Sequence, residues 1–243
     1  MTTRDDVDRL SRALRRAVEL ARRDLETAFT SLPLSNPEAA RDALLEIVPA
    51  LTRKYGDIAA TAAAEWYEEM RAREIGGRFT ATLADNADEA LVQSTVRRQA
   101  GHLWKPDQSK TLEVLAGSLQ RYITNSGRAT VARNAGQDPA RPRYARVPRG
   151  AKTCAFCMAM ASRGFFYHSQ EAAGGHWNHF HDDCDCQIVM VWDKDAHHIA
   201  GYNPDAMYDK YLQARESSGS GDLRVILAEL RRMFPDAVTD GVI

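Results

Sequence analysis

The residues most able to do chemistry are gathered in one stretch, residues 153–186. All four cysteines of the chain lie in it, as the pairs Cys154/Cys157 and Cys184/Cys186. Cysteine thiolates and histidine nitrogens are preferred ligands of zinc, and two cysteines separated by two residues can hold one tetrahedral ion. The same stretch contains His168, His176, His179 and His181. The sequence therefore predicts a metal-stapled module here.

The candidate ligands outnumber the four positions of a tetrahedral zinc site. They are Cys154, Cys157, His181, Cys184 and Cys186. We expect Cys154, Cys157, His181 and one of the last two cysteines, because a cysteine pair with only one residue between them chelates a single ion less readily. An all-cysteine site is the main alternative. Two free or disulfide-bonded pairs are another, although a disulfide requires an oxidising compartment, of which the sequence shows no sign.

The known catalytic zinc motifs are missing from the sequence. It lacks the H-E-x-x-H of zinc proteases, and Thr153 stands where zinc deaminases have the proline before their C-x2-C. A surplus of donors favours a closed, structural site. A nucleophilic Cys157 with His168 as its base is disfavoured, because a thiolate that binds a metal is quenched as a nucleophile. The sequence thus favours a role without catalysis.

A local excess of positive charge precedes the cysteines. Between residues 121 and 152 the only acid is Asp138, whereas the basic residues are Arg121, Arg128, Arg133, Arg141, Arg143, Arg146, Arg149 and Lys152. Such a patch can contact DNA phosphates, and the candidates for DNA contact are Arg141, Arg143, Arg146 and Arg149. A solvated face that balances the nearby Asp182, Asp183 and Asp185 is the favoured interpretation. The histidines between Gly175 and His181 are similar to those of histidine-rich nucleases, but no second acidic or histidine helix with matching spacing follows.

The run from Tyr144 to Trp192 resembles the C-terminal module of phage Mu F-like (MuF) minor head proteins. It shows a C-x2-C, then Ser162-Arg163-Gly164, then H-x2-C-x-C from His181 to Cys186. The entry from a long helix that ends in glycine, here Gly127 to Gly136, is similar too. Phe180 and Asp185 stand where the family often has proline and arginine, which leaves the ligand chemistry intact.

The resemblance implies a structural minor head protein of a tailed phage or prophage, associated with the portal vertex and with procapsid assembly. It further implies a portal, scaffold or capsid protein as partner. The expected location is the virion, in the head interior or at the portal vertex, after assembly in the host cytoplasm. The alternative is a capsid maturation (prohead) protease, and a DNA-binding or nuclease module ranks below that.

The composition fits a folded chain without a membrane segment. It has 243 residues, a formal net charge of −1 and 44% hydrophobic residues, enough for a core. No apolar run approaches the roughly 20 residues that span a bilayer, and the first residues lack the apolar core of a signal peptide. We therefore expect no membrane partner, reduced cysteines, and DNA binding only through a local patch.

The elements that must position the cysteines are mostly helices. Apolar periodicity predicts a helix over 4–30, capped by Thr3, and a second one from Ser35 or Asn36, in which Pro49 either causes a kink or starts a new helix. A break at Tyr55-Gly56 precedes an alanine-rich helix over 58–70, which Gly76-Gly77 closes. Further helices are expected from Asp85 or Asn86 to Gly101 and over 112–134. Residues 144–147 and 187–192 are expected to pair as strands. Helices over 204–216 and 223–234 follow, joined by a flexible Ser/Gly linker.

These elements predict a mainly α fold with a small α+β module. We divide the chain into a helical bundle (1–136), a Cys/His-rich, metal-knot-like module (137–200) and C-terminal helices with the Ser/Gly linker (201–243). The apolar faces of residues 7–28 and of helix 223–234 are expected to dock on partner proteins. The alternative, for both faces, is packing on the chain's own helices.

Overall fold

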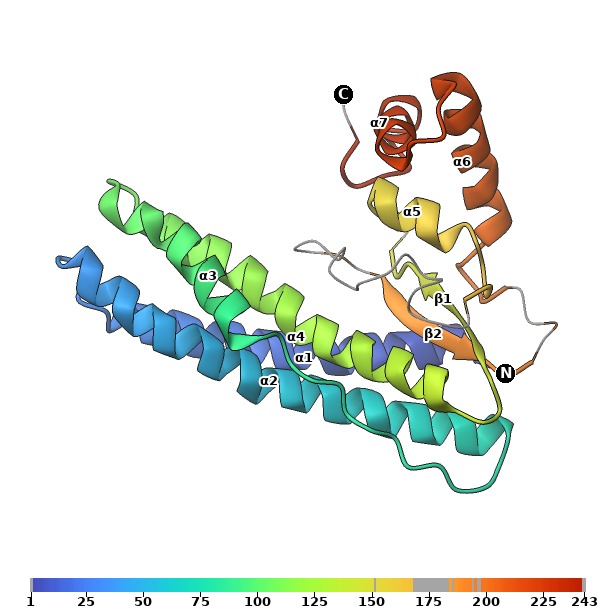
Figure 1. Ribbon diagram of the computed structural model, residues 1–243, viewed down its shortest axis with the longest axis horizontal. Coiled ribbons are helices and arrows are strands. Elements are labelled where there is room, and N and C mark those ends of the chain that lie inside the picture. Colours follow the sequence, from blue (N-terminus) through green and yellow to red (C-terminus); the bar gives the residue numbers. More distant parts are fainter. Residues whose placement is uncertain are drawn as a thin grey trace.

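A computed structural model describes residues 2–150, 152–167, 184, 186–193, 195 and 198–241. Helices α1 (Arg4–Thr30), α2 (Pro37–Glu74) and α4 (Ser109–Gln137) lie side by side as an elongated bundle (Figure 1). Helix α3 (Glu89–Gln99) and the short 3-10 helix η1 (Ala100–Trp104) pack on this bundle. The predicted fold class, mainly helical with a small α+β part late in the chain, is confirmed.

Helices α1 and α2 begin where their capping residues predict. The backbone N–H of Asp6 donates to Thr3 Oγ1, and that of Thr3 donates to Asp6 Oδ2 at 2.9 Å, which completes a capping box. Asn36 caps α2 through the backbone N–H of Ala39, with Pro37 in the first turn.

The expected break at Tyr55-Gly56 is wrong, because α2 continues through Pro49 and Gly56 to Glu74. A Cβ on Gly56 would lie 2.1 Å from Asn86 Oδ1 and 2.9 Å from Ser126 Oγ. The glycine therefore admits a close neighbour instead of ending the helix.

Helix α3 also begins later than expected, with Asp88 as its cap in place of Asp85 or Asn86. Residues 78–88 form a connection without regular structure along α4. Asn134 Oδ1 accepts from the backbone N–H of Thr82 at 2.8 Å, and Thr130 Oγ1 accepts from that of Ala84 at 3.0 Å. The backbone N–H groups of Thr82 and Ala84 thus find acceptors in polar side chains of α4, in place of the carbonyls that a helix would provide.

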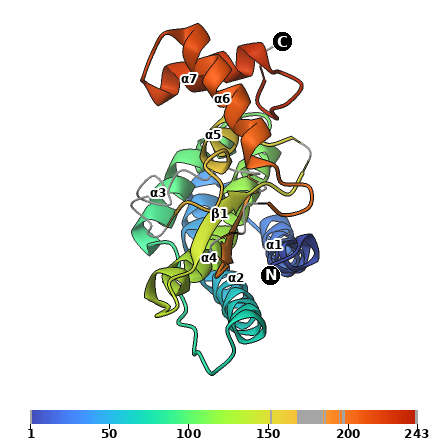
Figure 2. The same ribbon diagram turned by 90° about the vertical axis from the view of Figure 1, so that its right-hand side faces the viewer.

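Strands β1 (Arg143–Val147) and β2 (Gln187–Val191) pair antiparallel, with Tyr144 opposite Met190, which confirms the predicted pairing. Their apolar side chains belong to the same core as those of the bundle. Figure 2 shows the sheet at the end of the bundle near the N-terminus. A two-stranded sheet is marginally stable by itself, so this packing contributes to its stability.

Asp138, directly after α4, joins the bundle to the sheet. Its Oδ2 accepts from Tyr67 Oη at 3.0 Å, from Arg71 Nε at 3.1 Å and from Trp192 Nε1 at 3.1 Å. Burial raises the pKa of this carboxyl, but hydrogen bonds from the Ala140 backbone and from these side chains outweigh burial and leave the pKa lowered. Bundle and sheet thus share one polar anchor as well as one core.

Helices α5 (Ala155–Ala161), α6 (Pro204–Ser218) and α7 (Leu223–Met233) form a second apolar cluster beside the sheet (Figure 1). Ile226, Leu227 and Leu230 of α7 are buried in it. Helix α6 ends at Gly219, whose φ of 60° lets the chain reverse tightly, so α7 folds back onto α5 and α6.

The docking faces expected from the sequence are therefore mostly buried. The apolar stripe of α1 is buried inside the bundle, and most of that of α7 is covered by α5 and α6. An amphipathic pattern shows that a face is buried, but it does not show what buries it.

Candidate metal centre

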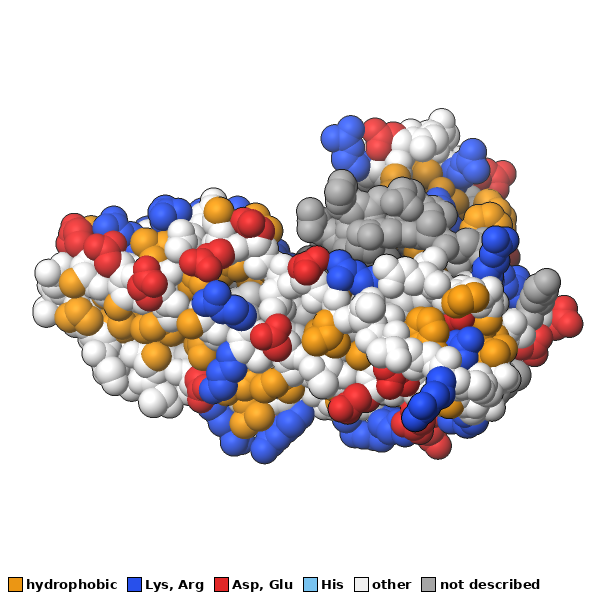
Figure 3. Space-filling model, turned by 60° about the horizontal axis from the view of Figure 1, so that its bottom comes forward, with side chains coloured by type: hydrophobic (Ala, Val, Ile, Leu, Met, Phe, Trp, Pro, Cys, Tyr) orange, Lys and Arg blue, Asp and Glu red, His pale blue; other side chains and the backbone are white. Residues whose placement is uncertain are grey.

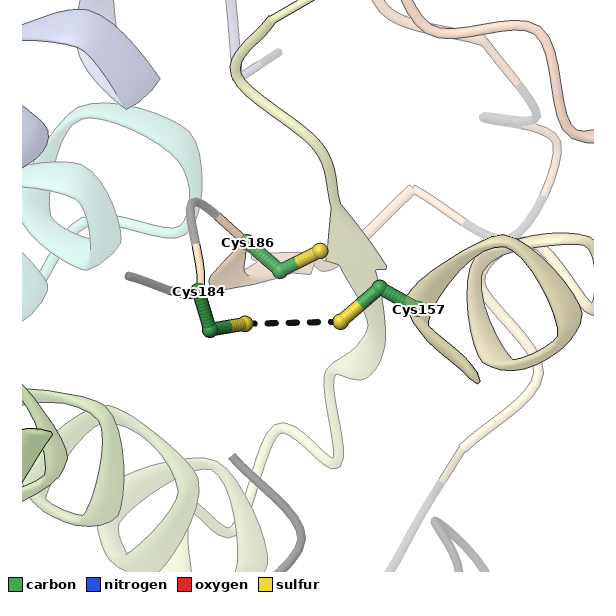
Figure 4. A group of neighbouring side chains, drawn as sticks. All are labelled: Cys157, Cys184 and Cys186. Carbon is green, nitrogen blue, oxygen red and sulfur yellow. Dashed lines mark hydrogen bonds between the residues drawn. The ribbon is translucent and has the colours of Figure 1, made fainter. Parts of the chain in front are cut away.

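Three cysteine sulfurs meet between α5 and the start of β2. The sulfurs of Cys157, Cys184 and Cys186 all lie within 4.8 Å of one another, and that of Cys157 is 3.4 Å from that of Cys184. Figure 4 shows the three side chains pointing toward a common centre, Cys157 from the helix and the other two from the segment leading into β2. Residues 27 positions apart in the chain, Cys157 and Cys184, are thus brought together at one point.

The local structure explains how Cys154 and Cys157 are placed. Cys154 is the N-cap residue of α5, and its Sγ accepts from the backbone N–H of Cys157 at 3.3 Å. The C-x2-C pair therefore lies on the first turn of a helix. Both residues are buried, as is Cys186, whereas Cys184 is partly exposed. None of the four cysteines, all of which lie in the described part of the chain, forms a disulfide.

The sulfurs influence one another's protonation. Hydrogen bonds with Cys154, Cys184 and Cys186, together with burial, raise the pKa of Cys157 well above its usual value. Hydrogen bonds from Cys157 and Cys186 lower the pKa of Cys184 to about 2, helped by the charge of Arg128 and opposed by burial. The cluster thus favours a thiolate at Cys184, and thiolates are the form in which cysteine binds metals.

The cluster fits a zinc ion. Zn–S bonds of about 2.3 Å in a tetrahedron place the sulfurs roughly 3.8 Å apart, a separation compatible with the 3.4 Å contact and the 4.8 Å limit observed. Cys184 and Cys186 both belong to the cluster, whereas only one of them was expected as a ligand; which of the cysteines bind a metal stays a prediction. Cys154 adjoins the cluster through Cys157, and His181 lies outside the described residues.

Two residues that support the cysteines were not predicted as part of the site. Thr153 Oγ1 lies 3.4 Å from Cys186 Sγ. Arg128 is 2% exposed and donates to the carbonyls of Cys186 and Cys184. Arg128 appeared in the sequence only as one member of a basic stretch, and nothing in its surroundings along the chain marks it as buried.

The four arginines predicted as DNA contacts differ in how exposed they are. Arg141 and Arg149 are exposed, and Arg143 is half-buried with a bond to the Asp193 carbonyl. Arg146 is 2% exposed, with its guanidinium 5.3 Å from the ring centre of Phe156, so it is not placed to bind a phosphate from solution. On the face shown in Figure 3, acidic and basic side chains are interspersed. DNA contact stays a prediction for the other three arginines.

None of the helices in the described ranges is long and apolar enough to cross a bilayer.

Comparisons with known proteins give one match. No curated protein and no solved structure matches the chain. The model of a family described as VG15 protein matches residues 1–214. Because this match takes in the bundle, the sheet and the cysteine cluster together, the chain belongs to the VG15 protein family, a family of viral proteins.

Proposed function

We propose that the chain is a minor head protein of a tailed phage or prophage, and that its cysteine cluster is a structural zinc centre. The observation that carries the zinc proposal is the convergence of Cys157, Cys184 and Cys186 on one point. Cys154 is our choice for the fourth ligand, with His181 as the alternative. The ion would cross-link α5 to the segment that leads into β2, and the free energy of its binding would stabilise that arrangement.

The surroundings of the cluster support a structural role. Cys157 and Cys186 are fully buried, and the backbone on both sides of the cluster is held by hydrogen bonds. A catalytic zinc needs one position open to water and substrate, whereas four thiols around one ion close it. The free energy of metal binding then adds to the folding free energy of the sheet and α5.

Elemental analysis of protein purified without a histidine tag tests the metal centre. We expect about one zinc per chain, as in a single four-ligand site. Cys157→Ser should lose it and loosen α5 and β2 while most of the helical circular dichroism remains. Met158→Leu, a volume-conserving change at the next position of α5, is the control. Absence of zinc, with all four thiols titrating freely, would refute the centre.

The role in the phage head rests on the viral family and on the likeness of residues 144–192 to MuF modules. A portal, scaffold or capsid protein is the proposed partner. The apolar stripe of α1 and most of that of α7 are buried, so we place the contact surface elsewhere on the chain.

Co-expression with the phage head proteins tests this role. The intact chain should co-purify with procapsids that contain the portal, and procapsids formed without the chain should differ in composition or yield. A chain that stays unbound while procapsids assemble normally would contradict the proposal. Cleavage of the scaffold or capsid protein by the purified chain would favour the prohead protease instead.

A further inference from the structure

The last residues of the chain, 235–241, pass over the start of α5, and we call them the strap. After α7 the chain turns back toward α5 (Figure 1). Val238 forms a parallel bridge with Thr153, and the backbone N–H of Thr239 donates to the Thr153 carbonyl at 3.0 Å. Val238 is 2% exposed in the apolar cluster of α5, α6 and α7. The strap is therefore packed as well as hydrogen-bonded.

Asp240 is the polar anchor of the strap. Its Oδ1 accepts from the backbone N–H of Ala155 at 2.8 Å, and its Oδ2 accepts from Arg231 Nε at 2.8 Å. The first N–H groups of a helix have no partner within the helix. Asp240 supplies one for α5 from the far end of the chain, while Arg231 fixes the carboxylate from α7.

These contacts fall on the residues that place the cysteine sulfurs. Thr153 and Ala155, both held by the strap, flank Cys154 on either side in the sequence. Thr153 also reaches Cys186 Sγ through its hydroxyl. Through Thr153 and Ala155 the strap therefore supports both the cysteines of α5 and Cys186, although none of its own atoms is a proposed ligand. Groups that orient the ligands of a metal typically change its affinity 10- to 100-fold when mutated.

The strap lies beyond the part of the chain that the family model matches, which ends at residue 214. We propose that the strap is a positioning clamp for the metal centre, with Asp240 as its key residue, so that a segment outside the matched region completes a site inside it. The expected effect of the strap on zinc affinity rests on the proposed zinc centre. The contacts to Thr153 and Ala155 do not depend on a metal.

Two variants of the strap test the clamp in the full-length protein. Asp240→Asn removes the charge that pairs with Arg231 and weakens the hydrogen bond that the side chain accepts from the backbone N–H of Ala155. Asp236→Asn makes the same chemical change at an exposed strap position that has no side-chain hydrogen bond or ion pair in the described part of the chain. Zinc affinity is measured by competition with a chromogenic chelator. We expect Asp240→Asn to bind zinc at least about tenfold more weakly than wild type, and Asp236→Asn to match wild type.

A second variant and a metal-free measurement keep the outcomes distinct. Arg231→Gln leaves Asp240 in place but removes its ion pair, so its zinc affinity should fall between those of the other two variants. In metal-free protein, Asp240→Asn should raise the rate at which a thiol reagent modifies the cysteines, whereas Asp236→Asn should not.

Equal zinc affinity and equal thiol rates in Asp240→Asn and Asp236→Asn would overturn the clamp. A wild-type chain that takes up no zinc would refute the proposed centre alone, because the thiol rates would still decide whether the strap positions the cysteines.

Discussion

Arg128, in the middle of α4, donates from its guanidinium Nε to the backbone carbonyl of Cys186 at 2.8 Å. The Nη2 of the same guanidinium donates to the backbone carbonyl of Cys184 at 2.7 Å. A buried side chain of the bundle thus holds the backbone of two candidate metal ligands at the start of β2. Hydrogen bonds from a charged donor are the stronger kind, so these two bonds attach the cysteine cluster to the bundle.

Replacing Arg128 with methionine should therefore destabilise the protein. The variant keeps much of the side-chain volume but leaves the buried Cys186 carbonyl and the partly buried Cys184 carbonyl without this donor. Each buried group that loses its partner costs about 1–3 kcal/mol. We expect a loss of about 2–4 kcal/mol, measured by urea unfolding. Arg133→Met on the same helix removes an exposed pair with Asp85 and an exposed hydrogen bond to the Leu83 carbonyl, and it should cost under about 1 kcal/mol. Equal losses in the two variants would show that the carbonyl contacts add little.

Gly127 and Gly136 of α4 should respond in opposite directions to alanine. A Cβ on Gly127 would lie 2.6 Å from Leu14 Cδ2 and 3.2 Å from the carbonyl oxygen of Ala59, so all three bundle helices meet there. We expect Gly127→Ala to lower the free energy of unfolding by about 1–2 kcal/mol. Nothing lies within 4 Å of a Cβ on Gly136, so Gly136→Ala should raise it by about 0.5–1 kcal/mol. A stabilising Gly127→Ala would mean that α1 is not packed this closely.

Acid should destabilise the fold partly through Asp6. Burial raises the pKa of this carboxyl, but bonds from Arg73 and from Thr3 outweigh burial and hold the pKa well below its ordinary value of 3.8. A pKa that is lower in the folded chain means that the unfolded chain takes up the proton first as the pH falls. The stability due to ionised Asp6 is thus complete above about pH 5 and is lost progressively below it.

Urea unfolding at pH 7 and pH 3 measures this contribution. Wild type should lose more stability between the two values than Asp6→Asn, by on the order of 1 kcal/mol. Asp5→Asn, at an exposed position in the same turn, is the control and should behave as wild type. Identical losses in wild type and Asp6→Asn would show that Arg73 does not hold the Asp6 carboxylate in solution.

The sequence by itself determined where most helices begin and which side chains could bind a metal. Periodic apolar residues gave α1 its bounds, and short-range capping bonds at Thr3 and Asn36 fixed where α1 and α2 begin. These signals are readable because the interactions join residues within one turn. The cysteine spacing indicated a metal-binding cluster for the same reason, since side-chain type and proximity along the chain already limit what the thiols can do.

Only the tertiary structure decided how distant residues meet. Gly56 resembles a helix break in the sequence, but it lies inside α2 with Asn86 against it. Arg128 resembles a surface charge in the sequence, but it is bonded to the carbonyls of Cys184 and Cys186. The apolar face of α7 resembled a docking surface, yet α5 and α6 bury most of it. In each case the deciding partner lies tens of positions away in the chain or on another helix. Sequence periodicity indicates that a side chain is buried. The free energy of packing determines which helix or strand that side chain packs against.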